Sequence, residues 1–354
     1  MQAVKSAHQR ALASVESGAH LGIQLHVSWQ GEVLLDEAYG ESAPGAPLTA
    51  DDAVPWVCCT KLLGALAMGQ LMETTGTSPD TPVSALVPAF TGFGKQTATI
   101  AHLMSHAIPF DTATTTMPFG RLTHEEALEA VATFQLSGAP GTGGWYSPME
   151  TWVVVAAMVR QLSGLPFDEY VQRHILDPLG MEQTVFGAVR AEALADHRIT
   201  LHDRAEGNFV PSTKLPDAIL EPGLPGTGAH GPARELARLA SPESWRDQLG
   251  LSDPTARTLT QHHRTGLVDT NFGDLDLDWG LGMCTDRAWF GAPRGARVAG
   301  HTAYGMGMVM ADLEEQLTVS FLSTSIVPQD GAGRLENHIV RDLCTAVRQE
   351  RDRA

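Results

Sequence analysis

Residues 297–323 have the sequence RVAGHTAYGMGMVMADLEEQLTVSFLS. They contain three short segments that are rich in apolar and β-branched side chains. Such segments are typical of β-strands, and the sequence predicts strands over 297–301, 305–312 and 316–323. Residues 313–315, Leu-Glu-Glu, supply the turn between the last two strands. Further along the chain, the apolar spacing over 335–350 predicts a terminal amphipathic helix.

The beginning of the chain is also rich in β-formers. Residues 22–29 (GIQLHVSW) alternate, Gln30-Gly31 predicts a tight turn, and 32–39 (EVLLDEAY) follow as a second strand. The residues before this hairpin, 1–20, have the pattern of an amphipathic helix. Strands at both ends of a helical middle predict one antiparallel sheet built from both termini, in an α/β (α+β) fold.

The middle of the chain is predicted to be mainly helical. A strong helix over 58–75 precedes it, and its clearest helices cover 99–106, 123–133, 148–163 and 166–175. We therefore expect an α/β sheet domain of residues 1–78 and 243–354, with an inserted, mainly helical domain of residues 79–242. Small molecules usually bind in clefts between such layers, so the active site is expected between the two domains.

Composition excludes several classes of function. The 354 residues carry 24 Lys and Arg against 41 Asp and Glu, a net charge of −17. Because phosphate binding needs clustered cations, we expect no nucleic-acid partner. The longest apolar run, 152–159, is too short to span a bilayer, so no membrane insertion is expected. Residues 1–20 lack the apolar segment of a signal peptide, and four cysteines in so long a chain are no disulfide framework, which predicts a cytoplasmic protein.

The best local signal for chemistry is Val57-Cys58-Cys59-Thr60-Lys61. Cys58 and Lys61 are three residues apart at the start of a predicted helix and therefore share one face. A thiol beside a helix N-terminus and a lysine loses its proton more easily, and a partly desolvated lysine could instead accept that proton. Cys59 is rotated away from Lys61 and is expected in the core. Taken alone, the C-x-x-K tetrapeptide also fits a structural thiol.

Several further segments, in a consistent order, give this motif a context. They are EAYG at 37–40, ATIAHLMSH at 98–106, PG at 140–141, WYS at 145–147, GLPFDEYVQRHILDPLGM at 164–181, WGLGM at 279–283 and AGHTAYG at 299–305. Together these segments resemble the penicillin-recognising serine hydrolases, the family of class C β-lactamases, penicillin-binding proteins, esterases and related acyltransferases, whose motif is S-x-x-K. The resemblance implies the β-lactamase/transpeptidase-like fold.

The resemblance also implies roles, residue by residue. Cys58 takes the place of the nucleophile, while Lys61 and Tyr146 take the places of the lysine and tyrosine that shuttle protons. His301 falls on the K-T-G or H-T-G motif, where it is expected to bind substrate or to tune the Lys61–Tyr146 pair. The backbone N–H groups of Cys58 and Tyr304 are the expected oxyanion hole. The resemblance implies no metal and no organic cofactor.

Three positions depart from the family pattern. Cys58 replaces the serine, Pro148 replaces the asparagine of the Y-x-N motif, and Ala303 replaces the glycine of H-T-G. Proline has no polar side chain to hold a substrate amide or the lysine, and the methyl of Ala303 is expected to narrow the groove beside the strand. β-Lactam and peptidoglycan substrates are therefore not expected.

A cysteine nucleophile changes the chemistry that we expect. Its thiolate would form a thioester, which reacts readily with amines and other thiols and comparatively slowly with water. With the resemblance, this favours a transacylase of specialised metabolism that passes an acyl group from Cys58 to an amine or hydroxyl. The partners would be a small-molecule acyl donor and acceptor, and a donor on a carrier-protein or coenzyme A thiol would fit. An esterase or amidase, and a catalytically inactive binding homologue, are the alternatives.

The substrate pocket is expected beside these motifs. The candidates, each within or next to a motif that should face the cleft, are Trp56, Trp145, Pro148, Trp279, Thr302, Ala303 and Tyr304. Aromatic walls would suit an apolar acyl chain or an aromatic substrate, although each aromatic side chain could equally pack between sheet and helices.

Two patterns resemble metal sites without completing them. His102 and His106 are four apart on a predicted helix, but the glutamate of H-E-x-x-H and a third ligand are missing. Asp274, Asp276 and Asp278 alternate with leucines, and without the glycine and distal glutamate of a calcium loop they predict an exposed strand face. No metal is therefore expected.

Overall fold

A six-stranded antiparallel sheet is built from both ends of the chain. The structure, a computed structural model, describes residues 1–115, 122–187, 192, 199–215, 219–327 and 334–353. The sheet has the order β3-β2-β1-β10-β9-β8, and every neighbouring pair is antiparallel. Its strands are β1 (Gly22–Trp29), β2 (Glu32–Ala43), β3 (Ala46–Pro47), β8 (Val298–Ala303), β9 (Gly307–Asp312) and β10 (Leu317–Ser323). The predicted sheet from both termini is thereby confirmed.

The two halves of the sheet meet where β1 pairs with β10, with Leu25 opposite Phe321. On its other side β1 forms the predicted hairpin with β2, through a turn at Gln30 and Gly31. Both turn residues have a positive φ, 51° and 81°, which matches the twist that a two-residue hairpin needs. The first six residues of β1 are buried, because helices cover both faces of the sheet.

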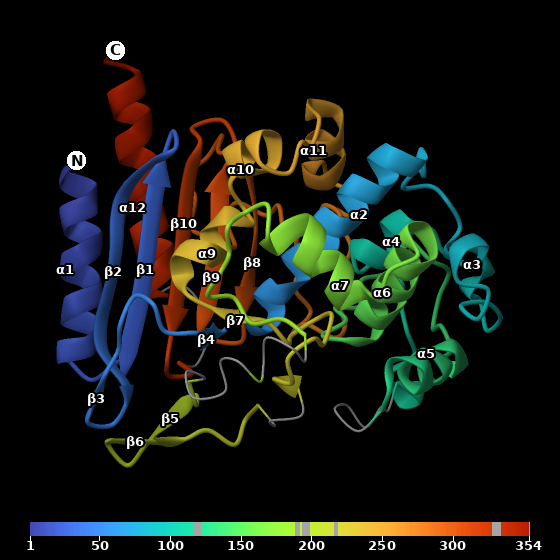
Figure 1. Cartoon of the computed structure of the whole chain (residues 1–354), viewed down its shortest axis with the longest axis horizontal. Coiled ribbons are helices and arrows are strands. Elements are labelled where there is room, and N and C mark those ends of the chain that lie inside the picture. Colours follow the sequence, from blue (N-terminus) through green and yellow to red (C-terminus); the bar gives the residue numbers. More distant parts are fainter. Residues whose placement is uncertain (116–121, 188–191, 193–198, 216–218, 328–333, 354) are drawn as a thin grey trace.

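Two helices cover one face of the sheet. α1 (Gln2–Glu16) and α12 (Leu335–Arg351) lie side by side, so both termini lie on the same side of the molecule (Figure 1). Their inner residues, such as Ala11 and Leu343, are buried in a core that they share with the strands. The two amphipathic helices predicted at the ends of the sequence thus pack their apolar sides on the same face of the sheet.

The opposite face carries α9 (Ala233–Arg238), and a block of helices lies beyond the edge strand β8 (Figure 1). The buried helix α2 (Lys61–Thr75) packs there against α6 (Glu150–Ser163), α7 (Phe167–Val171) and α11 (Asp253–Thr260). It has no polar face, as expected of a helix enclosed by others. Gly64 permits the close approach of α6, since a Cβ there would lie 2.8 Å from the Trp152 ring.

Shorter elements complete the helical block. They are α3 (Val83–Leu86), α4 (Ile100–Met104), α5 (His124–Thr133) and α10 (Pro242–Asp247), with the strand pairs β4 (Val54–Pro55) with β7 (His230–Gly231) and β5 (His202–Ala205) with β6 (Asn208–Pro211). In the described part of the chain, no helix is long and apolar enough to cross a membrane.

Most predicted elements are present with shifted ends. The helix predicted over 58–75 begins as a 3₁₀ turn, Val57–Thr60, and the one predicted over 166–175 divides into α7 and a π-helical segment, Gln172–Leu176. The exposed strand predicted at 274–278 is wrong: Asp274 has a φ of 56°, and within the segment only Leu275 forms an isolated bridge, to Asp269. The two-domain division stays a prediction, and α9, inside 79–242, packs on the sheet.

Candidate active site

Cys58 lies on the 3₁₀ turn Val57–Thr60, immediately before α2. Its side chain is half-buried and contacts both hydrophobic cores of the molecule. Val57, the residue before it, has a φ of 45°, a left-handed conformation that is strained for a β-branched residue. Such strain persists only where the surrounding structure holds the backbone, and it is most frequent at functional sites.

The contacts that hold this turn come from residues 229–231. The Trp56 backbone N–H donates to the Ala229 carbonyl at 2.8 Å, and its indole N–H donates to the Gly231 carbonyl at 2.9 Å. The Ala229 N–H donates in turn to the Thr60 hydroxyl at 3.1 Å. The fit is close, because a Cβ on Gly231 would lie 2.7 Å from the Trp56 ring. These bonds fix the backbone on both sides of Cys58.

Lys61 is completely buried below the thiol. Its Nζ donates to the Pro148 carbonyl at 2.7 Å and to the Gly226 carbonyl at 2.9 Å, and it also interacts with the Cys58 sulfur. Burial lowers the pKa of Lys61, and the interactions with Cys58 and then with Glu150 oppose that shift. The two carbonyls take two N–H bonds of the amine, which leaves one position of Nζ for Cys58.

Tyr146 approaches Cys58 from the loop before α6. The Lys61 nitrogen lies 5.3 Å from the centre of the Tyr146 ring, and the hydroxyl interacts with the Cys58 sulfur. Burial raises the pKa of Tyr146 well above its usual value, and Cys58 raises it further. Tyr146 is therefore brought from a distant part of the chain to Cys58 and Lys61, which share one turn, as the sequence leads one to expect.

His301 lies on the edge strand β8, with its ring 6.2 Å from that of Tyr146 and 5.5 Å from that of Trp279. Its Nδ1 is 2.7 Å from the Thr302 carbonyl and donates to it, so Nε2 carries the lone pair. Burial, together with the nearby Lys61, lowers the pKa of His301 to about 3. The ring is therefore neutral at physiological pH.

A cavity of about 330 Å³ opens beside Cys58. Its described lining is mostly apolar and contains no lysine, arginine, aspartate or glutamate; the residues are Val57, Cys58, Tyr146, Pro148, Met149, Leu215, Ile219, Thr227, Asn271, Phe272, Trp279, Trp289, His301, Thr302 and Tyr304. Tyr304 is 57% exposed and the Trp289 indole N–H donates to the Thr302 hydroxyl at 3.1 Å. The wall is thus aromatic and uncharged.

Three expected pocket residues do not line this cavity. Trp56 is completely buried, because its indole binds the Gly231 carbonyl within the core. Trp145 is buried in the core and packs edge-on against Phe110, with ring centres 5.2 Å apart. Ala303 is buried where β8 pairs with β9, and its methyl fills the space over Gly307, so it does not narrow the groove.

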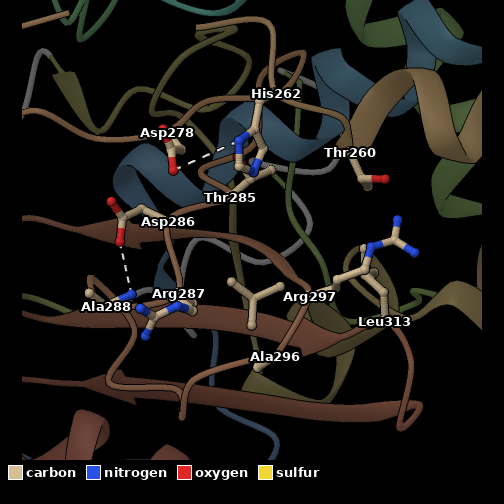
Figure 2. A pocket seen from close by; sticks show the side chains of 12 residues that line it. Thr260, His262, Asp278, Thr285, Asp286, Arg287, Ala288, Ala296, Arg297 and Leu313 are labelled. Atoms are coloured by element: carbon tan, nitrogen blue, oxygen red, sulfur yellow. Dashed lines mark hydrogen bonds and ion pairs between the residues drawn. The ribbon is translucent and has the colours of Figure 1, made fainter. Parts of the chain in front are cut away.

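A second cavity, of about 470 Å³, is larger but shares no lining residue with the first (Figure 2). Its wall is polar: His262 lies 3.8 Å from Asp278, and Asp286 accepts the N–H of Ala288 at 2.8 Å. Asp278 faces this cavity while its neighbour Trp279 lines the one at Cys58. Because none of Cys58, Lys61 and Tyr146 reaches the larger cavity, we place the candidate active site in the smaller one.

Four residues around Tyr146 were given no role at the active site by the sequence analysis. Asp269, Asn271 and Arg264 belong to a polar loop, and Asp269 and Asn271 bind the Tyr146 backbone directly. His106, considered above only as half of a metal pair, packs against Tyr146 with ring centres 4.7 Å apart. Only the clustering of Asp and Asn beside WGLGM could have drawn attention to the loop.

The other half of that histidine pair has a structural contact. The His102 ring accepts the Thr99 N–H at 3.3 Å and so caps α4. Among the residues that the structure describes, no group of three or more His, Cys, Asp or Glu side chains could hold a metal ion.

Comparison with known proteins agrees with this geometry. The family model described as "Beta-lactamase" matches residues 8–341. The chain belongs to the β-lactamase family. The resemblance seen in the sequence motifs and the β-lactamase-like fold are both confirmed by this match and by similar solved structures.

Several named proteins are similar to this chain. The lovastatin esterase of Penicillium rubens is 26% identical over 235 residues, which are 57% of this chain and 57% of that protein. The chain thus matches a little over half the length of this curated relative. Among solved structures, EstCE1, "a hydrolase with promiscuous acyltransferase activity", has a TM-score of 0.81 at 18% identity, covering 97% of this chain and 99% of that one. Simvastatin synthase from Aspergillus terreus has a TM-score of 0.72 at 17% identity, covering 99% and 96%.

Proposed function

We propose that this member of the β-lactamase family is a transacylase that carries the acyl group as a thioester on Cys58. The observation that carries the proposal is the convergence of Lys61 and Tyr146 on the Cys58 sulfur at the wall of an uncharged cavity. The named relatives, an esterase, a hydrolase with acyltransferase activity and a synthase, support acyl chemistry of this kind.

Lys61 has the environment of a general base. Two of its N–H bonds are taken by the Pro148 and Gly226 carbonyls, and burial favours the neutral amine, whose lone pair then faces Cys58. In the proposed first step Lys61 takes the thiol proton and the sulfur attacks the donor carbonyl. When the tetrahedral intermediate collapses, the bond to the leaving group breaks, and that group takes a proton through Tyr146. The product is the Cys58 thioester.

The second step reverses these proton movements. An amine or hydroxyl of the acceptor loses its proton to the Tyr146–Lys61 pair and attacks the thioester carbonyl. Collapse releases the acylated acceptor and returns the proton to the Cys58 sulfur. The backbone N–H groups of Cys58 and Tyr304 are proposed to bind the oxyanion in both steps, and the neutral His301 to orient the substrate or the proton shuttle.

The cavity indicates the class of acyl group. Since its described wall lacks a cation to bind a carboxylate, an uncharged, apolar acyl group fits it better than a β-lactam or a peptide C-terminus. A donor held on a carrier-protein or coenzyme A thiol would fit, as would a simple ester. We propose a role in specialised metabolism. A cytoplasmic setting is part of the proposal, supported by four cysteines that are all unpaired.

The test measures how the acyl group divides between acceptor and water. Wild type, Cys58→Ser and the buried control Cys284→Ser would be given aryl esters and acyl thioesters with increasing amounts of amines or alcohols. We expect wild type and Cys284→Ser to form mainly acylated acceptor, and Cys58→Ser to be slow and to release mainly free acid. Rapid hydrolysis by wild type that no acceptor diverts would instead establish an esterase.

A further inference from the structure

The backbone of Tyr146 is held on both sides by side chains of one loop. The Tyr146 N–H donates to Oδ1 of Asp269 at 2.8 Å. Nδ2 of Asn271 donates to the Tyr146 carbonyl at 2.7 Å, and the Asn271 N–H donates to the same Asp269 oxygen at 3.0 Å. The two peptide groups that flank the Tyr146 Cα are therefore both fixed by residues more than 120 positions later in the chain.

Asp269 is itself held by a buried arginine. Nη1 of Arg264 donates to Oδ2 of Asp269 at 2.8 Å and to the His106 carbonyl at 3.1 Å. The side chains of Arg264 and Asp269 are 0% and 2% exposed. The guanidinium lies directly against the backbone before Tyr146, because a Cβ on Gly144 would come within 2.6 Å of it.

The second of these two peptide groups, which joins Tyr146 to Ser147, is also held at its N–H. The Ser147 N–H donates to Nδ1 of His106 at 3.2 Å, and the His106 ring packs against Tyr146. Because Nδ1 accepts this bond, the ring proton of the neutral histidine is on Nε2. Burial lowers the pKa of His106 well below its usual value, with nearby Lys61 and Arg264 adding to the shift, so this arrangement is stable at neutral pH.

We propose that the loop 264–271 is the device that positions Tyr146 for its reaction with Cys58, with Asp269 and Asn271 as positioning residues. A buried ion pair such as Arg264–Asp269 is weak support for stability, because desolvation offsets much of the attraction. It does fix geometry. Cys58 and Lys61 share one turn, whereas Tyr146 comes from another part of the chain, and a misplacement of about 1 Å at a reacting group can cost about a hundredfold in rate.

This inference rests on the proposed function only in what the Tyr146 hydroxyl is used for, so it can be tested without an acyl donor. The readout is the rate constant for alkylation of Cys58 by iodoacetamide at pH 7, followed by peptide mass spectrometry. Cys59, Cys284 and Cys344 are buried and serve as internal references. A Tyr146 hydroxyl that donates to the sulfur stabilises the thiolate, so misplacing it should slow the alkylation.

Asp269→Asn keeps an acceptor for the Tyr146 N–H but removes the charge that binds Arg264. Asn271→Ala, at an exposed position on the cavity wall, removes the bond to the Tyr146 carbonyl and should fold normally. We expect each variant to slow alkylation about three- to tenfold, less than the full loss of a hydrogen bond to a charged group, because the Tyr146 hydroxyl is displaced and not removed. In a Tyr146→Phe background, itself slowed, neither substitution should slow it further, because residues that act as one unit are not additive.

Asp312→Asn is the matched control. Asp312 is also buried, pairs with Arg348 and accepts the N–H groups of Glu314 and Glu315, but it lies away from the cavity. It should lose thermal stability as Asp269→Asn does and keep the wild-type alkylation rate within about twofold.

Three results would overturn the inference. They are an unchanged alkylation rate in folded Asn271→Ala, an unchanged rate in Tyr146→Phe, and an equal slowing by Asp269→Asn with and without the Tyr146 hydroxyl. If the alkylation rates behave as expected while no acyl donor modifies Cys58, the positioning role stands and the proposed transacylase function fails.

Discussion

The side-chain nitrogen of Lys61 lies 2.7 Å from the main-chain carbonyl oxygen of Pro148. In the family that the motifs resemble, an asparagine side chain at this position helps to hold the lysine. Here the backbone of the same residue binds it, and the Gly226 carbonyl adds a second bond. The loss of the asparagine therefore leaves Lys61 well held and removes only a polar group from the cavity wall.

Pro148→Asn should accordingly have little effect on the reactivity of Cys58. Every residue has a carbonyl, so the bond to Lys61 survives, and we expect the rate of Cys58 acylation to stay within about threefold of wild type. Mass spectrometry of samples quenched at successive times during a single turnover would measure this acylation rate. A drop of a hundredfold would show that the proline itself sets the carbonyl's position.

Lys61→Met should abolish the proton transfer without removing the bulk of the side chain. We expect acylation of Cys58 to fall by about 10²–10⁴-fold, the usual contribution of a general base. The Pro148 and Gly226 carbonyls would lose their partner, at a cost of about 1–3 kcal/mol each in stability, measurable by urea unfolding.

Lys95→Met is the control for that experiment. Lys95 is also completely buried and donates to two backbone carbonyls, of Ala132 and Phe134, outside the site. It should be destabilised in the same way and acylate normally. Equal loss of acylation in both variants would mean that Lys61 acts through stability alone.

Acid should destabilise the protein through its buried neutral histidines. Burial lowers the pKa of His301 to about 3 and that of His20 to about 4, whereas the unfolded chain binds these protons near pH 6.5. Between about pH 6.5 and pH 4 the unfolded state therefore binds more protons than the folded state. As the pH decreases through this range, the free energy of unfolding should decrease by up to about 1.4 kcal/mol per pH unit for each histidine.

Urea unfolding between pH 7 and pH 4.5 would measure this slope, and His20→Gln should reduce it by the contribution of one histidine. His20 lies away from the cavity, and its Nδ1 is hydrogen-bonded to the Ser14 hydroxyl, so the variant should keep the active site intact. A slope that the substitution leaves unchanged would contradict a neutral His20 in the folded protein.

The size of the cavity should set the length of the acyl group. Ile219→Trp adds volume to the wall beside Cys58, so the rate of acylation should fall more steeply for long than for short acyl groups. Val210→Trp makes a similar enlargement at an exposed position on β6 and should leave the profile over chain length unchanged. If both variants changed the dependence of the acylation rate on chain length in the same way, or if Ile219→Trp did not change it, the acyl group would not bind in this cavity.

Much of the fold could be predicted because its signals are local. The hairpin turn at Gln30 and Gly31, the strands of 297–323 and the enclosed helix α2 all follow from spacing and turn chemistry. The nucleophile region could be found for the same reason, since Cys58 and Lys61 are one turn apart.

The rest of the site depends on contacts between distant segments, which a single sequence does not show. Trp56 and Trp145 were expected in the pocket because they adjoin motif residues, yet a neighbour in sequence can point to the other side of the backbone, and both lie in the core. No sequence pattern indicated that Asp269 and Arg264 belong to the site, because the residues of a polar loop normally face water. Only the fold shows that this loop is folded inward against Tyr146.

The central claim, a thioester on Cys58, is tested most directly by intact-protein mass spectrometry. Wild type and Cys58→Ala would be incubated with a panel of uncharged acyl thioesters and activated esters, and then with an amine or an alcohol. We predict a mass increase equal to the acyl group on wild type alone, lost faster in the presence of the acceptor than in buffer. An equal adduct on Cys58→Ala, or no adduct on a wild-type protein whose Cys58 iodoacetamide still alkylates, would contradict the account.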